Sequence, residues 1–300
     1  MMFRVRSALV FAAFTALAVS FATPDAAPAQ DKDKELVKQA REAAVANLKK
    51  ANIDKPTAVE TDGFLIVGSL PEEKAKALGE VLEKTTKLAR KALKYDDKET
   101  AWKGKLTVYY LPDNAEFKAL MRRAFQQPPE GVYANLRAEP PLLVDPADAP
   151  GKPSDADLYT NTAARIAGEH LKAKGTGAQN VPDWLRDGFG RATALRAEGT
   201  TSKRYLAYRA QARTAAGKVA LKDVWGESKL PGGDALATAF AEYLAYGPGA
   251  VKFPMFLDGL KPTENVAEPT IPQGLDAAGW KEKDLPMLEA AWKKWVAGGK

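Results

Sequence analysis

VPDWLRDGF, residues 181–189, is the stretch of sequence that decides the fold. Pro182 is favoured at the start of a helix, and it opens a predicted helix that continues to Ala197. Another predicted helix, from Asp157 to Lys174, comes directly before this stretch. We therefore expect two consecutive helices with a short connection at the centre of the second half of the chain.

Strands and helices alternate ahead of this pair. The pattern of β-branched and aromatic residues predicts four strands, namely Phe64–Val67, Leu106–Leu111, Val132–Leu136 and Leu142–Val144. A helix is predicted to begin at Pro71, with Leu78, Leu82, Thr85, Ala89 and Ala92 on one face. A further helix begins at Asp113, which forms a predicted capping box with Glu116, and runs to Phe125.

Asp145 to Asp157 is rich in Pro, Asp and Gly, which indicates a loop. It divides a mixed α/β half, residues 57–150, from a half with almost no strand signal, residues 151–300. Further helices are predicted in that second half, at Tyr205–Ala216, Ala235–Tyr246, Ala250–Leu260 and Leu285–Val296. The fold class expected is α+β, with a small mixed sheet followed by a mostly helical part.

Residues 30–56 form a charged N-terminal segment that is rich in Lys and Glu. Leu36, Ala40, Ala44 and Leu48 are spaced four residues apart in it, which gives a narrow apolar stripe at helical spacing. We interpret this segment as a solvated helix that docks weakly or as a flexible arm. Pro56 ends it.

Residues 1–29 have the three parts of a secretory signal peptide. Arg4 and Arg6 supply the positive start, Ser7–Ala22 is apolar, and the small residues Ala27 and Ala29 predict cleavage before Gln30. The apolar run is shorter than the roughly 20 residues that a spanning helix needs. We expect an exported mature protein, periplasmic or extracellular, with no membrane span after cleavage.

Two residue counts exclude much familiar chemistry. Hydrophobic residues make up 45% of the chain and charged residues 27%, as in an ordinary globular protein. There is no Cys, so disulfides, thiolate nucleophiles and Cys-ligated metals are excluded. His170 is the single His, so no pair of His ligands exists. The net charge of +6 is mild, and no dense basic block with aromatic residues predicts a nucleic-acid partner.

The 181–189 segment resembles the P-x-W-L-x-E-G signature of gluzincin metallopeptidases, particularly the bacterial peptidase-MA-like group. The resemblance extends to the segments around Phe240–Gly247, Phe256–Leu260 and Leu288–Val296, and covers about residues 57–296. It implies a zincin-like fold. In that family the preceding helix carries H-E-x-x-H, with two His ligands of zinc and a Glu general base, and the acidic residue of the next helix is the third ligand.

This chain departs from the family at the positions that bind zinc. With Leu171 aligned to the Leu that follows the family's second His, the first His falls on Ala164, the general base on Arg165 and the second His on Gly168. The third ligand falls on the shorter acid Asp187. The resemblance therefore implies a degenerate member whose zinc site is lost, with no cofactor.

An alternative alignment reads 166–170 as the inverted motif H-x-x-E-H. Glu169 then matches the Glu and His170 the second His, but the first His falls on Ile166, which cannot bind a metal. Under either alignment the His-His-Glu set is incomplete. Glu169, His170 and Asp187 stay as candidates for a relocated catalytic set.

Arg165 and Asp187 are expected to face one another across the two helices, with the cation replacing the charge of the zinc ion. In the alternative arrangement Arg165 points to solvent and Asp187 accepts a hydrogen bond from a backbone amide. Ala164 and Gly168, on the same face, would leave a small groove or let the two helices pack more closely. His170 is expected at the helix surface or at the edge of a cleft.

The leading hypothesis is an exported pseudopeptidase that binds a peptide or a cell-envelope component in the former active-site cleft. Whether it is an enzyme is left open, with a preference for no. The first alternative is a hydrolase or peptidase with a relocated catalytic set. The second is a basic periplasmic structural protein that contacts an anionic polymer.

Overall fold

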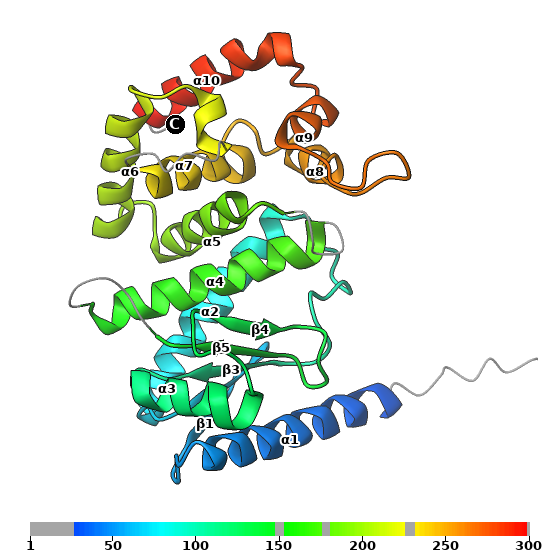
Figure 1. The fold of residues 1–300 in the computed structure, drawn as a ribbon, viewed down its shortest axis with the longest axis vertical. Coiled ribbons are helices and arrows are strands. Elements are labelled where there is room, and N and C mark those ends of the chain that lie inside the picture. The colour runs from blue at the N-terminus through cyan, green and yellow to red at the C-terminus, as the bar shows by residue number, and fades with distance from the viewer. Residues whose placement is uncertain (1–26, 148–152, 176–180, 226–231, 299–300) are drawn as a thin grey trace, which may run out of the picture.

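The protein has a mixed α+β fold in which the sheet lies entirely within the first half of the chain (Figure 1). The structure is a computed structural model that describes residues 27–147, 153–175, 181–225 and 232–298. The predicted signal peptide falls almost wholly outside these residues. No helix in the described part of the chain is long and apolar enough to cross a membrane.

Five strands form the sheet in the order β1-β2-β3-β5-β4. The central strands β2 (Phe64–Gly68), β3 (Leu106–Tyr110) and β5 (Leu142–Asp145) are parallel, and β1 (Thr57–Glu60) and β4 (Tyr133–Asn135) join the two edges in antiparallel orientation. The four predicted strands are confirmed. β1 was not predicted, since its four residues TAVE carry little hydrophobic signal.

Both faces of the sheet are covered, which explains why its central strands are mostly buried and apolar. Helices α1 (Ala27–Lys50) and α3 (Asn114–Leu120, followed by a π-helical turn at Met121–Phe125) pack on one face, where Leu65 and Val67 point. Helices α2 (Glu72–Ala92) and α4 (Asp155–Gly175) pack on the other face, against Phe64 and Ile66.

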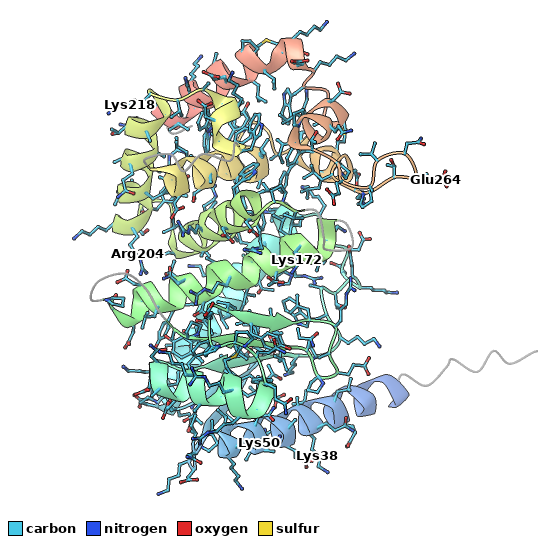
Figure 2. All side chains as sticks on the ribbon, in the orientation of Figure 1. Lys38, Lys50, Lys172, Arg204, Lys218 and Glu264 are labelled. Carbon is cyan, nitrogen blue, oxygen red and sulfur yellow. The ribbon has the colours of Figure 1, made fainter. Side chains whose placement is uncertain are left out.

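The charged N-terminal segment is a helix with one buried stripe. Ala44 and Leu48 are fully buried against the sheet and Ala40 is nearly so, while Lys38 and Lys50 project away from the sheet (Figure 2). The four-residue spacing therefore predicted the docking face correctly. This segment is part of the hydrophobic core and not a flexible arm.

The second half stacks helices on α4. Helix α5 (Asp183–Glu198) lies on α4, and α7 (Gly233–Tyr246) lies on α5 (Figure 1). The remaining helices surround α7 and close the second core, namely α6 (Lys203–Ala216), a 3-10 turn (Leu221–Trp225), α8 (Phe253–Asp258), α9 (Ile271–Ala277), a second 3-10 turn (Glu282–Asp284) and α10 (Leu285–Gly298). Helix α9 was not predicted, and α8 is shorter than expected.

Two glycines of α5 let it approach both neighbouring helices at backbone distance. A methyl group on Gly190 would lie 2.1 Å from the carbonyl oxygen of Ala164 on α4. A methyl group on Gly188 would lie 2.6 Å from the carbonyl oxygen of Ala237 on α7. Real side chains do not approach oxygens that closely, so the α4–α5–α7 stack requires glycine at both positions.

A buried carboxylate joins four helices of the second half. Glu242 on α7 is fully buried and accepts hydrogen bonds from Tyr205 (2.6 Å) and Tyr208 (2.7 Å) of α6. It is also paired with Arg196 of α5 (2.7 Å) and with Arg209 of α6 (3.4 Å). Arg209 in addition donates to two carbonyl oxygens of α10, those of Trp295 and Val296.

Replacing Gly190 by Ala should lower the free energy of unfolding by about 3 kcal/mol, because the added methyl forces α4 and α5 apart. Denaturant unfolding followed by circular dichroism measures the change. Gly217→Ala is the control, since a methyl there meets nothing closer than 4.0 Å, and it should change stability by less than about 1 kcal/mol. Equal effects of the two substitutions would contradict the close α4–α5 contact.

Glu242→Gln should cost about 3 kcal/mol, because it leaves the Arg209 guanidinium buried without its counter-ion. Thermal and denaturant unfolding measure the loss. Asp234→Asn removes a carboxylate that is 80% exposed and paired with Arg191, and it should change stability by less than about 0.5 kcal/mol. A Glu242→Gln variant as stable as this control would show that the buried network contributes nothing.

Candidate functional site

A cleft of about 700 Å³ opens where the edge strand β4 meets helices α4 and α5. Its floor is apolar, with Val132, Ala134 and Leu143 from the sheet and Ala164 and Gly168 from α4. The polar and charged side chains of its walls come from the two helices, namely Asn161, Arg165, Glu169, Arg186, Asp187 and Arg191. The cleft thus lies at the two helices that the sequence singled out.

Helical periodicity explains which residues of α4 reach the cleft. Asn161, Ala164, Arg165 and Gly168 are three or four residues apart, so they share one face of the helix. The degenerate motif positions Ala164, Arg165, Gly168 and Asp187 are therefore brought together, as the alignment implied. Sequence reasoning missed Asn161, Arg186 and Arg191, although Asn161 could have been found from this spacing.

The predicted pair between Arg165 and Asp187 is wrong. Arg165 forms a salt bridge with Asp145, a fully buried carboxylate at the end of β5. Asp187 instead pairs with its neighbour Arg186, whose Nε lies 3.0 Å from the Asp187 carboxylate. Asp145 was assigned to a loop in the sequence analysis, so its role as the partner of Arg165 was not foreseen.

The other two arginines of the cleft are also held by carboxylates. Arg186 contacts Asp183 at 3.0 Å in addition to Asp187, and Arg191 contacts Asp234 at 2.7 Å. Asp183 is 82% exposed and Asp234 is 80% exposed, and neither lines the cleft. Each guanidinium is thus positioned by an acid before any ligand arrives.

Glu169 differs from these residues. Its side chain is only 13% exposed and lines the cleft, and its nearest basic partner is Lys172 Nζ at 4.0 Å. Burial raises the pKa of Glu169; Lys172 and Arg186 oppose that shift, and Asp187 adds to it. The carboxyl group is therefore held in a partly desolvated position at the wall of the cleft.

His170 does not belong to the cleft, so the expectation of a surface or cleft-edge position is wrong. It is 2% exposed and packs between Trp102 (ring centroids 4.5 Å apart) and Tyr95 (5.8 Å). Neither ring nitrogen has a hydrogen-bond partner in the described structure. Burial, with a smaller contribution from Arg90, lowers the pKa of His170 to about 3, so the ring is neutral.

The relocated catalytic set is only partly assembled. Glu169 and Asp187 both line the cleft, whereas His170 points into the aromatic cluster on the other side of α4. Adjacent helical residues point about 100° apart, which separates Glu169 from His170. A proton relay through these three residues is therefore not formed.

The residues present do not fit a zinc ion. Ala164 and Gly168 carry no donor atom, and the nitrogen ligands that zinc prefers are absent from the cleft wall. A methyl group on Gly168 would already lie 3.0 Å from Arg186 Cγ and 3.2 Å from its carbonyl oxygen. Among the described residues, no three His, Asp or Glu side chains are grouped so as to hold a metal ion.

No protein-family profile matches the chain, and no curated sequence matches it.

Protein stability should fall in mild acid because of His170. The unfolded chain protonates this His near its ordinary pKa of 6.5, while the folded protein does so only near 3, so stability is lost as the pH falls below 6.5. Between pH 7 and pH 5 this residue alone should cost about 2 kcal/mol.

His170→Phe should remove that part of the pH dependence and keep the aromatic packing. Denaturant unfolding of the wild type and the variant at pH 5, 6 and 7 tests this, since all other titrating groups are common to both. Parallel stability curves for the two proteins would contradict the neutral, buried state of His170.

Proposed function

We propose that this protein is an exported pseudopeptidase of gluzincin-like fold that binds an extended peptide in the cleft between β4, α4 and α5. The observation that carries the proposal is the combination of an open cleft with small residues where the resemblance places zinc ligands. Ala164 and Gly168 both line this cleft. A binding role needs the cleft but not the metal.

The order of elements supports the gluzincin resemblance. A small mixed sheet ends in an antiparallel edge strand, and two consecutive helices lie beside it. Residues 181–189, which resemble the family signature, lead into the second of these helices, α5, and Asp187 lies on the cleft wall. This position supports the cleft as the place where a ligand would bind.

The edge strand supports a peptide as the ligand. β4 is the last strand in the sheet and, within the described residues, pairs with β5 alone, so the backbone groups of its other edge can accept a further strand. Val132 and Ala134 are two residues apart and both line the cleft floor. A peptide added to β4 would place alternate side chains over this floor.

The purified mature protein should contain no stoichiometric zinc after dialysis against added zinc and removal of the excess. Elemental analysis of the protein measures the content. One tightly held zinc ion per chain would contradict the proposal, and peptidase assays with Glu169 and Asp187 variants would then be required.

Ala134→Trp should abolish peptide binding, because the indole fills the cleft beside the edge strand. Binding is measured by NMR titration of the labelled protein with the neutral peptide acetyl-hexa-alanine amide. Arg137→Trp is the control, since Arg137 is exposed just beyond β4 and does not line the cleft. Shifts in the cleft residues that persist in the Ala134→Trp variant would place the peptide elsewhere.

A third outcome would favour the structural alternative. A basic protein that contacts an anionic polymer through its surface loses affinity steeply with added salt. Binding of a polyphosphate or polyuronate that disappears in 0.5 M salt and is unaffected by Ala134→Trp would argue against the cleft as the binding site.

A further inference from the structure

Each charged side chain of the cleft wall has a close partner of opposite charge, with one exception. Arg165 is paired with buried Asp145, and Arg191 with Asp234. Arg186 lies between Asp183 and Asp187, each at 3.0 Å, so two carboxylates share its single charge. None of these three arginines therefore presents an uncompensated positive charge to a ligand.

Glu169 is the exception. Within the described residues its carboxylate accepts no hydrogen bond, and its closest cation, Lys172, lies at the 4.0 Å limit of a salt bridge. Lys172 is 39% exposed and three residues further along the same helix (Figure 2). The Glu169 side chain is 13% exposed, so it is partly desolvated and a hydrogen-bond donor from a ligand would be favourable.

The remaining exposure of Glu169 is toward the cleft, whose wall it forms. A ligand in the cleft can therefore supply the donor that the protein does not. A positively charged donor gains most, because hydrogen bonds between ionised groups are about twice as strong as those between neutral groups. The ammonium group is compact and carries three donors, which suits it to a carboxylate at the wall of a cleft.

We propose that Glu169 is a recognition site for a primary ammonium group carried by the peptide that occupies the cleft. This inference rests on the proposed peptide-binding function and names the chemistry of its ligand. The ammonium group belongs either to a lysine side chain or to the free N-terminus of the peptide. Both present the same chemistry to the carboxylate.

Neighbouring charges permit this interaction. Arg186 is the cation on α5 that acts on Glu169, but Asp183 and Asp187 more than offset its charge. Asp187 also lines the cleft, so an incoming ammonium group approaches two carboxylates and one guanidinium. On α4 itself, Arg165 is neutralised by Asp145, and the Lys172 ammonium group lies 4.0 Å from the Glu169 carboxylate.

NMR titration with four peptides tests the proposal. The neutral peptide is acetyl-hexa-alanine amide; the second carries one central lysine in place of alanine, the third has a free N-terminus, and the fourth carries acetyl-lysine. The lysine peptide, the free-amine peptide or both should bind about ten-fold more tightly than the neutral peptide. The acetyl-lysine peptide should bind like the neutral one.

Glu169→Gln should remove the ten-fold gain, so that the lysine and free-amine peptides bind this variant no more tightly than the neutral peptide does. Asp183→Asn is the matched control. It removes a carboxylate that pairs with Arg186 but does not line the cleft, so this variant should keep the ten-fold gain. Circular dichroism confirms that both variants fold. The acetyl-lysine peptide tests the same contact in the wild-type protein, so the test stands even if the Glu169→Gln variant unfolds.

The two proposals fail in different ways. If all four peptides shift the cleft residues with equal affinity, the ammonium site is wrong and the peptide-binding function stands. If none of the peptides shifts the cleft residues, the peptide-binding function is wrong and the ammonium site fails with it. A gain that survives Glu169→Gln would assign the charge recognition to another residue.

Discussion

The position of helix α5 depends on its backbone touching the helices on both sides. Gly190 lies against the carbonyl oxygen of Ala164, and Gly188 lies against that of Ala237, at distances that exclude even a methyl group. Because no side chain separates the backbone of α5 from those of α4 and α7, many atom pairs are in contact, and their dispersion attraction stabilises the stack. α4, α5 and α7 therefore form one tightly packed stack, and the sheet contacts this stack through α2 and α4.

The same close packing shapes the cleft. Because α5 is pressed on α4, Arg186 lies directly over Gly168, within 3.0 Å of where a side-chain carbon would be. A side chain at this position would require Arg186 to shift, so the close packing of α5 on α4 favours a small residue here. Two buried acids hold arginines in place. Asp145 pairs with Arg165 at the cleft, and Glu242 pairs with Arg196 and Arg209 among the helices of the second half.

The prediction from sequence worked best where a pattern is local. The continuous apolar runs at Phe64–Val67 and Leu106–Leu111 predicted buried strands, and the stripe of Ala40, Ala44 and Leu48 predicted a docked helix face. It failed where a residue's role depends on a distant partner. Asp145 is twenty positions from Arg165 along the chain, and no periodicity links them. His170 is buried by Trp102 and Tyr95, which lie far earlier in the sequence.

Residue counts and spacing by themselves determined several properties of this protein. A chain with no Cys and one His cannot build a His-His metal site, and the spacing of Asn161, Ala164, Arg165 and Gly168 brings them to one helix face whatever the fold. Tertiary structure decided how the charges pair, which side of α4 faces the cleft, and that no described residue donates a hydrogen bond to the Glu169 carboxylate. Those outcomes depend on distances between segments that are remote in sequence. The packing of the helices on the sheet sets these distances.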